Sequence, residues 1–269
     1  MLISEFEAKL LDMFPVSDAE SWDRPGLSVG RPADEVRGVT LALNATCDTI
    51  QQAFDNGSNV LLTHHPICID WPQALTPAST EVSSASAAIY KAIELGISVI
   101  SLHTNLDRSF QARLQLPALL GFEATSSLEF PQASEKPGLG SLVHVQEADL
   151  CVGDLALRCE KAFDCQPTVW GRPDYPVHSI AILGGSLGHM TDIIANCEVD
   201  MVITGEVGYH VALDLYERGI SLILLGHDCS ENPFCTLLYN ASVAAGIDAD
   251  LIDFAHFECP WWTSRKENK

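Results

Sequence analysis

Two adjacent histidines follow an apolar run, in a place where they could bind a metal ion or take part in a reaction. Residues 60–62, Val-Leu-Leu, have the length and apolar character of a buried strand, and His64 and His65 come one threonine later. Pro66 has no N–H to donate to a sheet and therefore ends the strand. Because ligands bind at the carboxyl ends of the strands in open α/β sheets, the histidine pair predicts a binding site there.

Metal-binding residue types also follow two later apolar runs. The segments His-Thr-Asn-Leu-Asp (103–107) and His-Asp-Cys-Ser-Glu (227–231) each come at such a strand end. The candidate ligands are then three imidazoles and two carboxylates, from His64, His65, Asp107, His227 and Glu231. This set suits Zn, Fe or Mn, and because it needs no cysteine it argues against a structural zinc site.

Adjacent histidines are awkward ligands for a single ion, but they suit two ions about 3.5–4 Å apart. We therefore predict a centre of two divalent metal ions, with one histidine of the pair on each ion. Asp107 and His227 would bind opposite ions, and Glu231, one helical turn after His227, would bridge them. The sequence leaves open which histidine binds which ion. It also allows an alternative in which the clusters bind no metal, because a strand-end histidine is usually an ordinary hydrogen-bonded residue.

Other polar residues at strand ends have two readings each. Glu206 and His210, four residues apart, are candidate catalytic residues, as a general base and the group that orients it. Alternatively they are a helix N-terminal acid and an exposed histidine. His103 is expected to lie behind the ligands. Residues 184–188, Gly-Gly-Ser-Leu-Gly, form a strand-to-helix turn that either cradles a phosphate or is only a tight turn.

A structural unit that occurs twice places these clusters. Residues 94–102 and 217–225 are identical at six of nine positions, and each segment runs from a helix end through glycine into an apolar strand. The correspondence extends upstream, which predicts a strand–helix–strand–helix–strand unit at about 39–107 and again at about 178–231. Such alternation predicts parallel strands.

The predicted fold class is therefore α/β, with two related domains, mostly parallel sheets and the metal site in the cleft between the domains. A Ser-, Pro- and Gly-rich segment near 125–140 is expected to connect them. We expect residues 1–128 to form the first domain, completed by about 235–269, and residues 129–234 to form the second.

The composition excludes several classes of protein. The chain has 269 residues, 47% of them hydrophobic, but no apolar stretch of the about 18–20 residues that span a membrane. A net charge of −21 argues against a general nucleic-acid surface or an anionic membrane surface. Nine cysteines, odd in number and irregularly spaced, are expected to be reduced thiols. Together with an N-terminal segment that lacks the basic start of a signal peptide, they predict a cytoplasmic protein.

Several motifs resemble those of one family, named after NGG-interacting factor three and also called dinuclear metal centre proteins or GTP cyclohydrolase I type 2. Residues 22–30 resemble its W-D-N-x-G-L-x-V-G element, with Arg24 in place of the asparagine. Residues 63–66 match its T-H-H-P, and residues 103–107 match its H-T-x-x-D. Its last two elements are matched by Gly205-Glu206 with His210 and by Gly226-His227 with Glu231.

The resemblance implies a two-domain α/β subunit with a metal pair between the domains, and a toroidal homohexamer. It places the ligands at the same five residues, His64, His65, Asp107, His227 and Glu231. The chain departs from the family by an extra Leu187 in the glycine turn and by lacking the central insertion of longer members, so it resembles the short form.

Two functions fit these expectations. The first is a metal-dependent hydrolase that acts on a nucleotide-like or other small phosphorylated or heterocyclic substrate, with Glu206 or His210 moving protons. The alternative is a non-enzymatic metal-binding or regulatory scaffold that acts through protein partners. Trp261 and Trp262 near the C-terminus fit such a partner surface, and equally a subunit interface.

Overall fold

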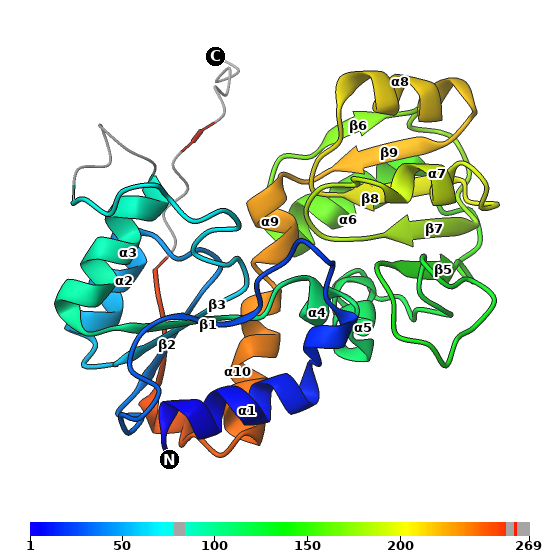
Figure 1. The fold of residues 1–269 in the computed structure, drawn as a ribbon. Helices are drawn as coiled ribbons and strands as arrows, with labels where there is room; N and C mark the ends of the chain where they lie inside the picture. Colours follow the sequence, from blue (N-terminus) through cyan, green and yellow to red (C-terminus); the bar gives the residue numbers. More distant parts are fainter. Residues whose placement is uncertain (78–83, 257–260, 263–269) are drawn as a thin grey trace.

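The computed structural model describes residues 1–77, 84–256 and 261–262. Its strands form two five-stranded sheets, which stand beside each other with α9 (His227–Glu231) between the two units (Figure 1). The prediction of two α/β units is confirmed. The predicted residue boundaries of the two domains stay a prediction.

The first sheet has the order β1-β4-β3-β2-β10. Strands β2, β3, β4 and β10 are parallel to one another, and β1 is antiparallel to β4. The strands are β1 (Gly26–Val29), β2 (Val39–Ala42), β3 (Val60–Thr63), β4 (Ser98–Ser101) and β10 (Ile252–Phe254). The C-terminal strand therefore lies in the sheet that the N-terminal part of the chain begins.

The second sheet has the order β5-β7-β8-β9-β6. Strands β7, β8 and β9 are parallel, and the outer strands β5 and β6 are antiparallel to them. The strands are β5 (Ser141–His144), β6 (Thr168–Trp170), β7 (Ser179–Ile182), β8 (Met201–Thr204) and β9 (Ser221–Leu224). The three parallel strands of each predicted repeat thus lie in the centre of one sheet.

Helices cover both faces of the two sheets because neighbouring strand residues point to opposite sides. Leu61 packs towards α2 and α3, whereas Leu62 joins the largest core, which also holds Phe6 of α1, Leu238 of α10 and Leu155 of α6. The helices are α1 (Ile3–Met13), α2 (Cys47–Asp55), α3 (Ser84–Leu95), α4 (Thr104–Asp107), α5 (Phe110–Leu119), α6 (Val152–Phe163), α7 (Met190–Ile194), α8 (Tyr209–Glu217), α9 and α10 (Phe234–Ala244), with short 3₁₀ turns at Val16–Asp18 and Ala249–Leu251. A single core therefore continues from the first sheet to the second.

The sequence reasoning did not predict β1, α4 or α5. Strand β1 is only four residues long and lies between Pro25 and Gly30, which resemble loop residues. Helix α5 contains Pro117, and a proline within a helical pattern normally predicts that the helix ends before it. Tertiary packing explains both, because β1 pairs with β4 and α5 packs against α10.

Candidate metal centre

The histidine pair lies where the chain turns at the end of β3. The N–H of His64 donates to the carbonyl of Ala42 (3.2 Å), and Thr63 Oγ1 donates to the carbonyl of His65 (2.7 Å). Because the backbone turns, the two rings do not diverge to opposite faces of the sheet; their centroids are 5.1 Å apart. Both imidazoles are therefore available to one site.

The structure brings all five candidate ligands together. Glu231 is the junction: its Oε2 lies 2.8 Å from His65 Nε2 and 3.0 Å from His227 Nε2, and its Oε1 lies 3.8 Å from His64 Nε2. Asp107 Oδ1 lies 3.4 Å from His64 Nε2. The two oxygens of one carboxylate thus face two different sets of ligand atoms.

His64 Nε2 and Asp107 Oδ1 are placed to share a metal ion rather than to hydrogen-bond to each other. Both atoms are buried and have no hydrogen-bond partner among the described residues. Buried polar atoms are nearly always satisfied, so this orphaned pair calls for a partner. Two ligand atoms about 2.1 Å from one ion lie about 3.0–3.4 Å apart when the bond angle is about 90–110°, which matches their separation. Two groups of side chains lie close enough together to hold a metal ion, namely His64 with His65 and His103, and His65 with His227 and Glu231.

Each ligand histidine is held through its Nδ1 atom. His64 Nδ1 donates to the carbonyl of Leu102 (2.9 Å), His65 Nδ1 to Asn44 Oδ1 (2.7 Å) and His227 Nδ1 to Glu206 Oε1 (3.0 Å). These oxygens can only accept, so they fix the proton on Nδ1. The lone pair of each Nε2 then points to the centre, as metal-binding imidazoles require.

Helix α9 carries His227 and Glu231 and is seated on the glycine turn of the second unit. Ser230 Oγ is buried; it accepts the N–H of Gly185 (2.9 Å) and donates to the carbonyl of His227 (2.7 Å). A Cβ on Gly185 would lie 2.2 Å from Glu231 Oε1. The turn at residues 184–188 therefore needs glycine so that the backbone can approach Glu231.

The electrostatics of the centre favour positive charge at the positions that metal ions would take. Burial lowers the pKa of His64, but the carboxylates of Asp107 and Glu231 outweigh this and raise it to about 9. The hydrogen bond to Glu231 raises the pKa of His227 to about 9, and burial raises the pKa of Asp107 to about 6. Burial would also raise the pKa of Glu231, but the three histidines hold it well below its usual range. A cation at the centre would replace the protons that His64 and His227 carry without it.

His103 contributes more than the sequence suggested. Its Nδ1 donates to Asp23 Oδ1 (2.8 Å), and its ring lies 5.4 Å from that of His64 and 5.5 Å from that of His65, between centroids. Its ligand atom lies within 4.8 Å of theirs. Burial would raise the pKa of Asp23, but hydrogen bonds from His103, Thr104 and Arg24 lower it to about 2. Sequence reasoning missed Asp23, for which the only signal was the Trp-Asp motif at residues 22–23.

Of the two predicted catalytic residues, the structure brings Glu206 to the centre and leaves His210 apart from it. Glu206 contacts His227. His210 lies on the first turn of α8, is exposed and packs its ring against Tyr209 (5.4 Å between centroids). It does not line either of the hollows that reach the centre.

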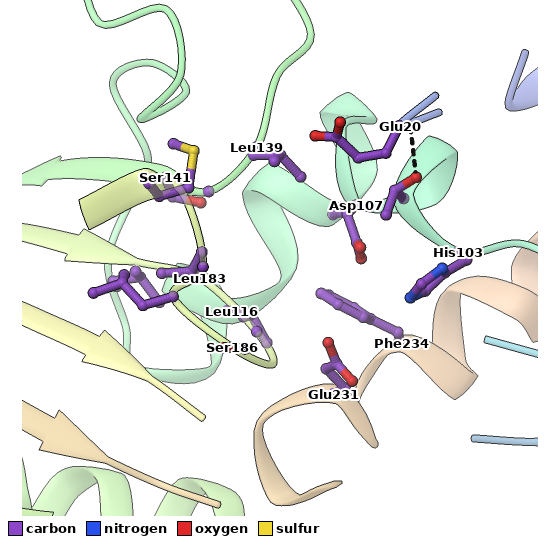
Figure 2. A pocket seen from close by; sticks show the side chains of 18 of the residues that line it. Glu20, His103, Asp107, Leu116, Leu139, Ser141, Leu183, Ser186, Glu231 and Phe234 are labelled. Atoms are coloured by element: carbon purple, nitrogen blue, oxygen red, sulfur yellow. Dashed lines mark hydrogen bonds between the residues drawn. The ribbon is translucent and has the colours of Figure 1, made fainter. Parts of the chain in front are cut away.

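Two hollows reach the centre from different sides. A cavity of about 260 Å³ between the two units ends at His103, Asp107 and Glu231, and Figure 2 shows these side chains beside Phe234. The rest of its lining mixes aliphatic side chains, including Leu116, Leu139, Leu183 and Met190, with polar and charged ones, including Glu20, Arg113 and His189. A groove of about 430 Å³ opens on the other side, at His65, with Asn44, Glu206 and Trp261 in its walls. His227 lines both hollows.

This chain is similar to known proteins in family, in sequence and in structure. The family model for Duf34/NIF3 (NGG1p interacting factor 3) matches residues 1–253. A protein of Clostridium acetobutylicum named "GTP cyclohydrolase 1 type 2 homolog" is 31% identical over 226 residues, 82% of each chain. A protein of Campylobacter jejuni with the same name is 31% identical over 238 residues, 88% of this chain and 90% of that one.

Solved structures share the fold at lower identity. A hypothetical protein of Staphylococcus aureus superposes with a TM-score of 0.85 at 23% identity, covering 98% of this chain and 99% of that one. A Bacillus cereus protein related to NIF3 gives 0.84 at 19% identity, with the same coverage. The fold observed here is therefore the fold of these proteins.

Proposed function

The chain belongs to the Duf34/NIF3 family, and from this premise we propose that it is a hydrolase with a centre of two divalent metal ions, Zn, Fe or Mn. The observation that carries the proposal is the position of Glu231. Its Oε1 faces His64 and Asp107, and its Oε2 faces His65 and His227, so one carboxylate can bridge two ions.

The residues then divide into two ligand sets. His64, Asp107 and Glu231 Oε1 would hold the inner ion, and His65, His227 and Glu231 Oε2 the outer one. Metal ions held in this way would acidify bound water and stabilise charge on an electrophilic carbon or phosphorus. Asn44 and Glu206 keep His65 and His227 in the tautomer that exposes Nε2.

The group best placed to move a proton is His103. Its Nδ1 proton is fixed by the buried Asp23, which leaves Nε2 on the side of His64 and His65. Asp23 holds the ring in place and fixes its tautomer, as acid–base catalysis by histidine requires. Glu206, the predicted base, stays a candidate at the groove, and His210 stays a prediction without a contact to the centre.

The proposed substrate is a small nucleotide-like, phosphorylated or heterocyclic molecule. The name given to relatives, GTP cyclohydrolase 1 type 2 homolog, supports that class. The cavity and the groove both give such a molecule a path to the centre. From the resemblance we also propose a toroidal homohexamer, and from the composition a cytoplasmic location. Within the described residues, no helix has the length and apolar character needed to cross a membrane.

Metal analysis combined with a screen for hydrolysis of nucleotides and nucleosides tests the proposal. We expect about two ions per chain in the wild type, and loss of both metal and turnover in His64→Ala and Glu231→Gln. His178→Ala, which removes an exposed histidine at the start of β7, is the matched control and should keep both. Turnover that persists unchanged in both centre variants would refute the hydrolase. Two bound ions without turnover would instead favour the metal-binding or regulatory scaffold.

A further inference from the structure

Trp261 is fixed at the groove that also exposes the candidate ligands His65 and His227. Its Nε1–H donates to Asp228 Oδ2 (3.1 Å), and Asp228 directly follows the candidate ligand His227. A Cβ on Gly226 would lie 3.7 Å from Cζ2 of the indole, so the ring packs over the backbone at the start of α9. An aromatic side chain from the C-terminal segment is thus held in a defined place, 33 residues from its partner in sequence.

The indole nevertheless keeps about half of its surface open. Trp261 is 47% exposed, and it lines the groove together with His65 and His227. These two are also the more exposed ligand histidines, with side chains 21% and 39% accessible, whereas His64 is fully buried. A molecule that approaches through the groove therefore meets the indole and the outer ligands together.

The polar groups of the groove favour an uncharged molecule. Glu206 is exposed and can accept hydrogen bonds, and the residues that line the groove within the described part of the chain include neither lysine nor arginine. Two divalent ions would bring a charge of +4, which the carboxylates of Asp107, Glu231, Glu206 and Asp228 offset. With a net charge of −21 over the chain, the groove has little attraction for a polyphosphate.

We propose that Trp261 is the stacking platform for a planar, uncharged heterocycle with N–H donors, of the nucleobase class, bound in the groove next to the outer ligands. The inference rests on the proposed function and narrows its substrate class. The indole supplies the face on which the ring stacks, and Glu206 accepts from the N–H edge of the ring. A phosphate chain on the same molecule would have to point out of the groove.

Titration calorimetry of the metal-loaded protein with guanosine, adenosine and cytidine, each compared with its 5′-triphosphate, tests the proposal. The variants are Trp261→Ala and Trp261→Phe, and the matched control is Trp262→Ala, because Trp262 is adjacent and 83% exposed. Metal content is measured for every protein, so that binding is compared at equal occupancy.

We expect at least one nucleoside to bind the wild type and Trp262→Ala with the same Kd. Trp261→Ala should raise that Kd about fivefold or more, as removal of a base-stacking aromatic does, and Trp261→Phe should restore most of the affinity. The triphosphates should bind no tighter than the nucleosides. Three results would overturn the inference: an unchanged Kd in Trp261→Ala, tighter binding of the triphosphates, or no nucleoside binding at all. If the wild type still holds two ions in those cases, the proposed function stands. A wild type that holds fewer than two ions overturns both.

Discussion

Replacing Gly185 by alanine is expected to displace Glu231 and empty the metal centre. The backbone of Gly185 has a φ of +61°, and an added Cβ would lie 2.2 Å from Oε1 and 3.0 Å from Cδ of Glu231. Non-bonded carbon and oxygen atoms in contact are about 1 Å further apart than the 2.2 Å between this Cβ and Oε1. The carboxylate of Glu231 must therefore move by about 1 Å. Metal–ligand distances vary by only about 0.2 Å, so such a movement would take Glu231 out of the position in which it could hold metal.

The matched control is Gly188→Ala in the same turn. Gly188 also has a positive φ, +49°, but the nearest atom to an added Cβ is the carbonyl oxygen of Ser186 at 3.8 Å. Both substitutions carry the strain of left-handed backbone, about 1–2 kcal/mol. Only Gly185→Ala adds overlap with a buried side chain, about 1–3 kcal/mol more, because the three histidines restrain Glu231.

Urea unfolding of the metal-free proteins and metal titration together measure the effect. Gly188→Ala should lose about 1–2 kcal/mol of unfolding free energy and keep its metal affinity. Gly185→Ala should lose about 2–5 kcal/mol in total, and its metal affinity should fall about tenfold or more. Equal stability and equal metal affinity in the two variants would refute the argument that the turn exists to admit Glu231.

Two predictions concern the dependence of the protein on pH. Metal binding must displace protons from His64 and His227, because their pKa values are raised to about 9. Apparent metal affinity should therefore rise with pH from 6 towards 9, and calorimetry in buffers of different ionisation enthalpy should detect the released protons. A metal affinity independent of pH would contradict this prediction. Asp23→Asn should cost about 2 kcal/mol of unfolding free energy at neutral pH, because hydrogen bonds outweigh burial and lower the Asp23 pKa from 3.8 to about 2. Since the depressed pKa stabilises the fold above pH 3.8 and the effect is lost towards pH 2, unfolding curves of variant and wild type should converge there, and a constant difference would refute the assignment.

The fold was predictable from the sequence because its signals are local. Helix-end glycines and apolar runs recur at the same spacing in both halves, and they locate the three parallel strands at the centre of each sheet. Local pattern could not predict β1, since its pairing with β4 joins residues 70 to 75 positions apart. Helix α5 was missed for a similar reason, because Pro117 is tolerated only in the context of its packing.

The candidate site was predictable in its residue types and less so in its contacts. The five candidate ligands lie together because strand ends converge at one edge of a sheet. Their binding of metal stays a prediction. The pairing of Asp23 with His103 and that of Trp261 with Asp228 depend on distant segments that meet only in the folded chain. His210 shows the converse, since helical spacing from Glu206 did not bring it to the centre.

The two related units supply different side chains to the candidate centre, which is therefore asymmetric. In the first unit the ends of β3 and β4 supply His64, His65 and Asp107, whereas in the second unit the ends of β8 and β9 supply Glu206, His227 and Glu231. Neither unit alone presents a complete ligand set, because Glu231 must reach across to both histidines of the first. Ions that bind only the folded chain would stabilise it, by a free energy that rises with the logarithm of the ion concentration above Kd. In this protein that stabilisation would act on the contact between the units, because Glu231 of the second unit reaches His64 and His65 of the first.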